Sequence, residues 1–278
     1  MTRYTAAVIQ LDSQDDKKRN LEAIVRFVRE AAEHGAKLIA MPENANYAGR
    51  DMKAEAEAVP GGETFNILSE LALEYKAWIH GGSIYEINET AGDERPYNST
   101  MLIGPDGRLA AKYHKIHPFD VKLANGGPSI MESDRVCPGD KIVTVETGEL
   151  GTLGLSICYD IRFGEIFRLM ALKGAEIFLT PANFTLNTGK DHWETILRAR
   201  AIENGCYVIA PGQTGKKLKY QAYGNSMIID PWGTVIARAG ERPGIIYGEI
   251  DLDHLKKVRS QVLTLENRRE DIYSLVER

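Results

Sequence analysis

The first 43 residues contain two short apolar segments separated by an amphipathic one, and this order limits the folds open to the chain. TAAVIQL (5–11) and KLIAMPE (37–43) have the length and composition of buried strands. Between them, the spacing of apolar residues predicts a helix over NLEAIVRFVREAAEHG (20–35), beginning at Asn20 and ending at Gly35. A strand, a helix and a strand at this spacing form a βαβ unit with parallel strands.

The same alternation continues through the rest of the chain. Apolar runs typical of strands are WIHGGSIYEI (78–87), GTLGLSICYD (151–160), EIFLTPANF (176–184) and CYVIAPGQT (206–214). Helical spacing is found in FNILSELALEYKA (65–77), EIFRLMALKGA (165–175) and HWETILRARAIENG (192–205). Residues 95–115 predict two strands joined by a turn at 104–107.

These elements predict one α/β domain over residues 1–278, with mixed sheets between layers of helices. A doubly wound nucleotide-binding fold is the structural alternative. It is disfavoured because no G-x-G-x-x-G follows the first strand and no GxxxxGK[ST] occurs in the sequence. The DPWG segment (230–233) is interpreted as a turn set by its proline and glycine, with Trp232 packed against the protein.

Composition excludes several classes of function. A net charge of −5 gives no basic footprint for nucleic acid. The sequence lacks an apolar run of about 18 residues, and its first residues are too polar for a signal peptide, so we expect no membrane contact. The three cysteines, Cys137, Cys158 and Cys206, are far apart and form no CxxC pair. This pattern argues against disulfides and a zinc site, and it favours a reducing cytoplasm.

Cys158 is the most informative residue. It follows the apolar run GTLGLSI and precedes the polar segment YDIRFGE, which places it at a strand-to-helix turn. Such a turn lies at the carboxyl edge of a sheet, and its free backbone N–H groups can stabilise an oxyanion. A buried, unreactive cysteine is the commoner explanation for a single thiol, and we keep that interpretation for Cys137 and Cys206.

Two charged residues have settings that suit work beside a thiol. Glu43 ends the KLIAMPE strand, also at a carboxyl edge, where burial would favour a general base. Lys115 lies in the dense polar segment KYHKIHPFD (112–120) and can donate to negative charge at a tetrahedral centre. His114 and His117 in this segment form only an HxxH pair without a third ligand, so a metal site is not expected.

Three separated motifs together resemble a known family. PEN (42–44), YHKIHPFD (113–120) and GLSICYDIRFGE (154–165) are similar, in this order, to the Glu, Lys and Cys motifs of the nitrilase superfamily of carbon–nitrogen hydrolases. The resemblance extends from AAVIQLD (6–12) to RREDIY (268–273).

The resemblance implies a fold and an assembly. The family fold is a four-layer αββα sandwich, usually paired into a homodimer, and residues 253–278 are expected in the dimer contacts. It also implies an enzyme that needs no metal and no cofactor and takes a small-molecule amide as substrate.

The resemblance also implies roles for individual residues. Glu43 would be the general base, Cys158 the nucleophile that forms a thioester, and Lys115 an oxyanion ligand together with the backbone N–H of Tyr159. A second glutamate should lie between the Lys and Cys motifs. Glu132 in GPSIMESDRVCPGD (127–140) fits this position best, whereas Glu146 and Glu149 match it less well.

Several segments are most similar to the Nit branch, whose amidases act on ω-amides of short dicarboxylates and on deaminated glutathione. In that branch, residues matching Arg162 and Phe184 line the substrate pocket, and Thr188 is a weaker candidate. Arg162 suits a bidentate clamp for a carboxylate, although an ion pair with Glu165 is the structural alternative. The chain departs from the family at Gly164, where proline is common, so the helix start there is expected to be looser.

The motifs leave several functions open. An N-carbamoyl-amine hydrolase, an aliphatic amidase and a nitrilase would use the same four residues. A catalytically idle family member that serves as a binding or scaffold protein is an alternative of a different class. The loops at 44–58 and 215–224 are candidate rims of the pocket.

Overall fold

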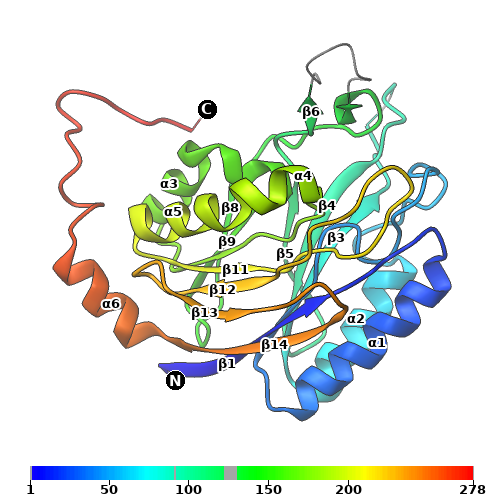
Figure 1. Ribbon diagram of the computed structural model, residues 1–278, viewed down its shortest axis with the longest axis horizontal. Coiled ribbons are helices and arrows are strands. Elements are labelled where there is room, and N and C mark those ends of the chain that lie inside the picture. The colour runs from blue at the N-terminus through cyan, green and yellow to red at the C-terminus, as the bar shows by residue number, and fades with distance from the viewer. Residues whose placement is uncertain (1, 91, 122–129, 278) are drawn as a thin grey trace.

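Two six-stranded sheets lie face to face with helices on their outer faces, in a computed structural model that describes residues 2–90, 92–121 and 130–277 (Figure 1). In spatial order, the first sheet consists of β14 (Gly244–Asp251), β1 (Arg3–Gln10), β2 (Leu38–Ala40), β3 (Trp78–Glu86), β4 (Tyr97–Ile103) and β5 (Leu109–His114). The second consists of β13 (Val235–Arg238), β12 (Met227–Ile229), β11 (Tyr207–Ala210), β10 (Ile177–Leu179), β9 (Thr152–Leu155) and β8 (Val143–Glu146).

The helices complete a four-layer αββα sandwich. The pair α1 (Lys17–Glu33) and α2 (Glu63–Tyr75) covers the first sheet, and α3 (Gly164–Leu172) and α5 (Glu194–Asn204) cover the second (Figure 1). The remaining elements are the short α4 (Leu186–Thr188), the C-terminal α6 (Leu252–Gln261) and the hairpin of β6 (Asp120–Val121) and β7 (Ile130–Met131). The predicted fold class is confirmed.

The two sheets share one plan of strand directions. In the first, β1, β2 and β3 are parallel and β14, β4 and β5 are antiparallel additions. In the second, β9, β10 and β11 are parallel, with β8, β12 and β13 antiparallel. The βαβ unit predicted from the first 43 residues is therefore present, and an equivalent parallel centre recurs in the second sheet.

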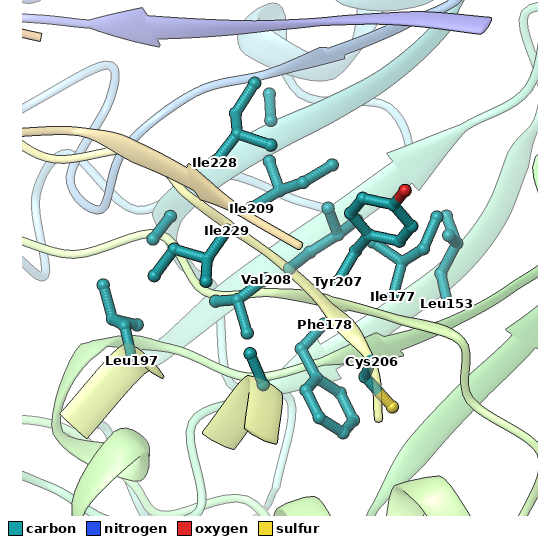
Figure 2. Close-up of a cluster of buried hydrophobic side chains, with 14 of the residues drawn as sticks. Leu153, Ile177, Phe178, Leu197, Cys206, Tyr207, Val208, Ile209, Ile228 and Ile229 are labelled. Carbon is teal, nitrogen blue, oxygen red and sulfur yellow. The ribbon is translucent and has the colours of Figure 1, made fainter. Parts of the chain in front are cut away.

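Alternating side chains connect each sheet to two cores. On β1, Ala6 and Val8 belong to the core between the sheets, whereas Ala7 and Ile9 pack with the residues of α1 and α2. In the second sheet, the neighbours Ile177 and Phe178 of β10 lie on opposite faces (Figure 2). Because both faces of each sheet are covered, the central strands are mostly apolar, as the sequence runs indicated, although β3 also buries His80 and Ser83.

Two local predictions are wrong. Helix α1 begins at Lys17 rather than Asn20, because the Asp16 carboxylate caps it by accepting a hydrogen bond from the backbone N–H of Arg19 (3.0 Å). Trp232 of the DPWG turn is 56% exposed instead of packed, since the turn lies at the surface end of the β12–β13 pair.

The side chains predicted to be functional lie where strands end. Glu43 follows β2, Lys115 follows β5 directly, and Cys158 follows β9. The parallel centres of the two sheets bring their carboxyl ends to one edge of the sandwich, which is where open α/β folds place their sites. In the described ranges, no helix has the length and apolar character needed to cross a membrane.

Candidate active site

Cys158 occupies a strained turn between β9 and α3. Its backbone has φ of 48°, a left-handed conformation that is unusual for a residue other than glycine. A 3₁₀ turn begins at Cys158 and extends to Arg162. The side chain is only 7% exposed, yet it lines a cavity. The turn thus presents a mostly buried thiol to a pocket, as the sequence predicted.

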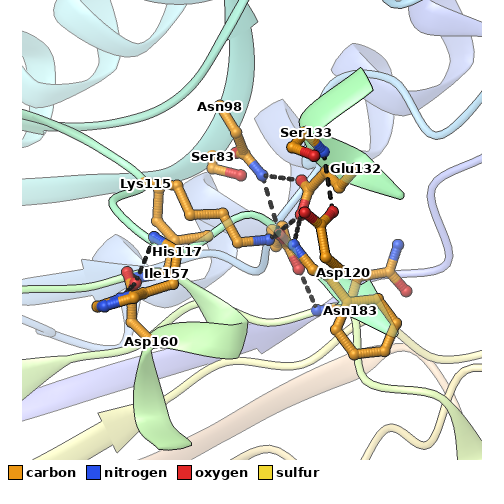
Figure 3. A network of polar contacts seen from close by, with 12 residues as sticks. Ser83, Asn98, Lys115, His117, Asp120, Glu132, Ser133, Ile157, Asp160 and Asn183 are labelled. Atoms are coloured by element: carbon orange, nitrogen blue, oxygen red, sulfur yellow. Dashed lines mark hydrogen bonds and ion pairs between the residues drawn. The ribbon is translucent and has the colours of Figure 1, made fainter. Parts of the chain in front are cut away.

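Asp160 fixes this turn from inside the protein. Its carboxylate is completely buried and accepts hydrogen bonds from the backbone N–H of Ile157 (2.8 Å) and the hydroxyl of Tyr113 (2.6 Å). It also accepts from the backbone of His117 (3.2 Å) and lies 2.7 Å from the Nδ1 atom of the same residue (Figure 3). Asp160 therefore joins the turn that carries Cys158 to the β5 segment that carries Lys115.

Both oxygens of the Glu43 carboxylate are held by hydrogen bonds. Oε1 accepts from the amide of Asn98 (2.9 Å) and the ammonium of Lys115 (3.0 Å), and Oε2 accepts from the backbone N–H of Asn183 (2.8 Å). Asn98 lies on β4 and Asn183 follows β10, so the two sheets together orient this carboxylate. Glu43 is buried.

Lys115 bridges the two predicted glutamates. Its Nζ atom donates to Glu43 and also to Oε2 of Glu132 at 2.8 Å (Figure 3). The lysine side chain is 2% exposed, so this cation lies almost out of contact with water. Burial would lower the pKa of Lys115, but Glu132 and Glu43 together raise it well above its ordinary value. Lys115 is thus a fixed positive charge inside the site.

Glu132 occupies the place predicted for the second glutamate. It begins a 3₁₀ turn (Glu132–Asp134), accepts from the backbone N–H of Phe119 as well as from Lys115, and its Oε1 atom lies 3.4 Å from the Asn98 amide. The alternatives lie elsewhere: Glu146 is an exposed residue at the end of β8, and Glu149 accepts from the indole N–H of Trp78 (2.9 Å).

The electrostatics keep the thiol protonated at rest. Burial raises the pKa of the Cys158 thiol well above its ordinary value, and the negative charge of Glu43 raises it further. The Lys115 cation lowers this pKa, but the two raising effects are larger. A reaction at this sulfur therefore needs a base to remove the proton, and Glu43 is the adjacent carboxylate.

Free polar groups surround the thiol. The backbone N–H of Cys158 donates to Pro181 O (2.8 Å) and that of Asp160 to Ile157 O (3.1 Å), whereas the N–H of Tyr159 has no acceptor among the described residues. The cavity is also lined by Asn44 and Asn183, whose Nδ2 and Oδ1 atoms, respectively, are buried without a partner in the part of the chain described. These groups can bind a carbonyl oxygen and an amide nitrogen.

Both loops that the sequence indicated as rims contribute to the cavity. Its volume is about 590 Å³. Residues 44, 48–50 and 52 come from the first loop, and residues 218–220 come from the second. Tyr85 on β3 and Phe119, which follows the Lys motif, complete the wall beside the predicted catalytic residues. Glu43, Lys115, Glu132 and Cys158 all line this one cavity.

The predicted substrate-binding side chains lie outside it. Tyr159, Arg162, Phe184 and Thr188 are not among the residues that line the cavity. The guanidinium of Arg162 lies over the rings of Tyr159 (5.7 Å) and Phe184 (5.4 Å) and contacts His192, and it makes no ion pair with Glu165. Thr188 contacts Thr185 through its hydroxyl (3.1 Å). A substrate role for these four residues stays a prediction.

Gly164 and the GPSIMES segment were also singled out from the sequence. Gly164 begins α3, where a Cβ atom would lie 3.0 Å from the Arg200 guanidinium, and this guanidinium donates to Ile161 O (2.9 Å) in the turn before the helix. Residues 127–129, the first part of GPSIMES, lie outside the described residues.

The other two cysteines and the histidines of the Lys motif can also be placed. Cys206 is buried and donates to Ala175 O, and Cys137 is also a free thiol. His114 lies 2.9 Å from Glu86, and His117 stacks on Phe163 at 3.6 Å. Within the described ranges, His, Cys, Asp and Glu side chains form no group of three or more that could hold a metal ion.

Sequence reasoning missed the amides and the buried acid of this site. Asn44, Asn98, Asn183 and Gln213 orient or line the catalytic group, and Asp160 holds its turn. The sequence offered a signal for three of them, because Asn44 lies in the PEN motif, Asn183 in PANF and Asp160 in CYDIRF.

Comparison with known proteins agrees with this geometry. The sequence model of the family described as carbon–nitrogen hydrolase matches residues 5–260. A deaminated glutathione amidase of Synechocystis sp. (strain PCC 6803 / GT-S) is 41% identical over 272 residues, which cover 96% of this chain and 99% of that relative. The omega-amidase NIT2 of Homo sapiens is 40% identical over 278 residues, covering 99% and 98%, respectively.

A solved structure shows the same fold. The crystal structure of Saccharomyces cerevisiae Nit3, a member of branch 10 of the nitrilase superfamily, matches with a TM-score of 0.87 and 32% identity, covering 96% of this chain and 97% of that one. The match to the family model spans nearly all of the sandwich and includes Glu43, Lys115, Glu132 and Cys158. The chain belongs to the carbon–nitrogen hydrolase family.

Proposed function

We propose that the protein hydrolyses the C–N bond of a small carboxylated amide through a thioester on Cys158. One observation carries the proposal: a protonated, buried thiol and a buried carboxylate, Glu43, line one cavity with a cation, Lys115, held between them and Glu132. This is the combination of nucleophile, base and electrostatic stabiliser that acyl transfer requires.

In the first half of the reaction, the sulfur of Cys158 attacks the amide carbon while Glu43 takes the thiol proton. The carbonyl oxygen becomes an oxyanion, stabilised by the Lys115 ammonium and the free N–H of Tyr159. Glu43 then gives its proton to the nitrogen as the C–N bond breaks. Ammonia or an amine leaves, and the acyl group remains as a thioester.

In the second half, Glu43 removes a proton from water, which attacks the thioester carbon. The same two donors stabilise the second oxyanion, and the thiolate leaves and regains its proton from Glu43. Glu132 holds the Lys115 ammonium in place and, as a second carboxylate, keeps it charged.

The names of the relatives support the substrate class, because one is a deaminated glutathione amidase and the other an omega-amidase. We therefore propose an ω-amide or a deaminated glutathione-like amide. N-carbamoyl amines, simple aliphatic amides and nitriles are the alternatives to be compared in the assay.

We also propose that the chain works in the cytoplasm as a homodimer, with residues 253–278 in its contacts. The free thiols suit a reducing compartment. Support for pairing comes from large apolar side chains on the outside of α3, α5 and the DPWG turn, and on the C-terminal segment: Leu172, Ile202, Trp232, Ile272, Tyr273 and Val276. Light scattering on the full chain and on a chain ending at residue 262 tests this, and a monomeric full chain would contradict it.

An ammonia-release panel of α-ketoglutaramate, deaminated glutathione, N-carbamoyl amines and nitriles tests the function. We expect release from the carboxylated amides, no release by Cys158→Ala, and an acyl adduct on Cys158 of the wild-type chain by mass spectrometry after rapid quenching. Turnover by Cys158→Ala would show that the nucleophile is wrong. A wild-type chain that hydrolyses none of these compounds would favour a binding or scaffold role.

A further inference from the structure

The outer wall of the active-site cavity carries positive charge that the chemistry at Cys158 does not use. Arg50, Arg135 and Lys219 are exposed side chains that line the same cavity as the thiol. Within the described residues, none of the three side chains makes a hydrogen bond or an ion pair. Asp134 is the acidic residue on this outer wall, so the mouth is positive on balance.

Two of these cations, Arg50 and Arg135, also line a second cavity. A second cavity of about 680 Å³ shares Arg50, Met52, Asp134 and Arg135 with the first. The pair Arg50 and Arg135 therefore lines both the cavity that holds Cys158 and the cavity next to it.

The other basic residues of the second cavity are already neutralised. Lys53 forms an ion pair with Glu94 (2.5 Å), and Arg95 forms one with Asp93 (2.6 Å). Asp51 adds one more acidic side chain to this wall. An anion that enters this space thus finds its available partners at Arg50 and Arg135, and each guanidinium can donate two parallel hydrogen bonds to a carboxylate.

The inner end of the cavity favours a neutral group over an anion. Glu43 and Glu132 outnumber the Lys115 cation there, so an anionic group beside the thiol is repelled while a neutral amide is accepted. Arg162 does not offset this charge, because it lies over aromatic rings outside both cavities. The polarity of the space therefore orients a substrate with its amide inward and its anionic end outward.

We propose that Arg50 and Arg135 form a specificity site for the carboxylate at the far end of an elongated acyl chain. The ligand class is an amide whose carboxylate is separated from the scissile carbonyl by a chain that reaches the border of the two cavities. Lys219 adds attraction at the mouth. This inference rests on the proposed function and adds the residues that select among carboxylated amides.

The test compares pairs of substrates in wild type and Arg50→Met/Arg135→Met. Each pair is an ω-carboxylated amide and its neutral methyl ester, in a series of increasing chain length, and the readout is the ratio of their kcat/KM values. We expect the wild-type ratio to rise with chain length and to fall with ionic strength. In the double variant the ratio at the preferred length should fall by at least about tenfold, because each arginine that is removed supplies charge-assisted hydrogen bonds.

Arg29→Met is the matched control, because Arg29 is an exposed arginine on α1 that lines neither cavity. Its ratio should equal that of wild type. An unchanged ratio in the double variant at every chain length would overturn the proposal. An equal loss of kcat/KM for both members of each pair would give this result.

A binding experiment separates this inference from the proposed function. On a Cys158→Ala background, calorimetry measures the Kd of the same ω-carboxylated amides, with and without the two arginines. We expect about tenfold weaker binding without them. Equal Kd values with and without the arginines would overturn the specificity site even if amides are hydrolysed. If the arginines strengthen binding but the wild-type protein hydrolyses no amide, only the hydrolytic function would be refuted.

Discussion

The ammonium nitrogen of Lys115 lies 3.0 Å from a carboxylate oxygen of Glu43, although 72 positions of sequence separate the two residues. Both residues follow strands of the first sheet, whereas Cys158 follows a strand of the second. The Glu43 carboxylate and the Lys115 cation are thus positioned by one sheet, and the packing of the other sheet brings the thiol to them. Because Glu43 raises the pKa of the Cys158 thiol and Lys115 lowers it, the protonation of the thiol depends on both charges.

Replacing Glu43 with glutamine should separate thiol reactivity from turnover. Turnover loses its base, so kcat for the amide should fall by about 10²–10⁴-fold. The thiol pKa should fall at the same time, because the negative charge that helps to raise it is gone while Lys115 remains. Alkylation of Cys158 by iodoacetamide should therefore reach its half-maximal rate at a lower pH than in wild type.

The control for that experiment is Cys158→Ala, which should leave only the slow labelling of the other two thiols. An alkylation profile that moves to higher pH in Glu43→Gln would contradict the charge relationship. Retention of wild-type kcat would contradict the role of Glu43 as base.

Replacing Lys115 with methionine should destabilise the fold by about 3–5 kcal/mol, because two buried carboxylates lose their shared cation. The folded-state pKa of Lys115 is raised, so its contribution is fully present below the unfolded value of 10.5 and disappears only as pH rises through the folded value. Urea unfolding should thus show the same loss at neutral pH and at about pH 9.

A double-mutant cycle checks this explanation. Adding Glu132→Gln to Lys115→Met removes one of the uncompensated charges, so the double variant should be more stable than the lysine variant alone. Additive losses from the two substitutions would show that Lys115 and Glu132 do not interact energetically in solution.

The fold was predictable because its signals are local. Each parallel strand is a short apolar run, and helices with one apolar face follow it, so the pattern along residues 5–43 already indicated parallel layers. Helix α1 shows the limit of such reasoning. Its start depends on which of several polar residues caps it, and Asp16, four positions before Asn20, does so.

The clustering of Glu43, Lys115 and Cys158 was also predictable, because each lies in a motif that resembles the family. The residues that orient them were not, because an asparagine such as Asn98 in an apolar strand has no local pattern that points to a partner 55 positions away. Arg162 illustrates the remaining difficulty. Its motif indicated a substrate contact, but which cavity an arginine lines depends on side-chain packing that sequence alone does not encode.

Asp160 should control the catalytic turn from within the core. Asp160→Asn keeps the shape but leaves one oxygen to accept the four contacts made by Tyr113, Ile157 and His117. We expect kcat to fall more than KM rises, since the turn shifts the thiol rather than the walls of the cavity. Tyr113→Phe is the milder control: it removes the hydrogen bond that this hydroxyl donates to Asp160 and the one it accepts from the backbone N–H of Ile116, at a cost of about 1–3 kcal/mol of unfolding free energy. Wild-type kcat in Asp160→Asn would contradict a positioning role.

Lys217 should hold the second rim loop in place. This buried lysine donates to Asp12 (2.9 Å), to Ser13 O (2.8 Å) and to Gln213 (3.1 Å), and Gln213 in turn donates to Glu43 O (3.0 Å). The next three residues, 218–220, line the active-site cavity. Lys217→Met should therefore raise KM more than it lowers kcat, because it frees the rim while the catalytic contacts remain.

The titration of Lys217 gives a second, independent readout. Burial lowers its pKa below the ordinary 10.5, and Asp12 offsets only part of this effect. Between the folded and unfolded pKa values the unfolded chain binds more protons, so the wild-type fold gains stability as pH rises through that window. The methionine variant lacks this gain. The difference in unfolding free energy between wild type and Lys217→Met should thus shift in favour of wild type from about pH 8 to about pH 10, as urea titrations at each pH will measure. A difference that moves toward the variant would mean that the folded-state pKa of Lys217 is raised, and its pairing with Asp12 would then outweigh its burial.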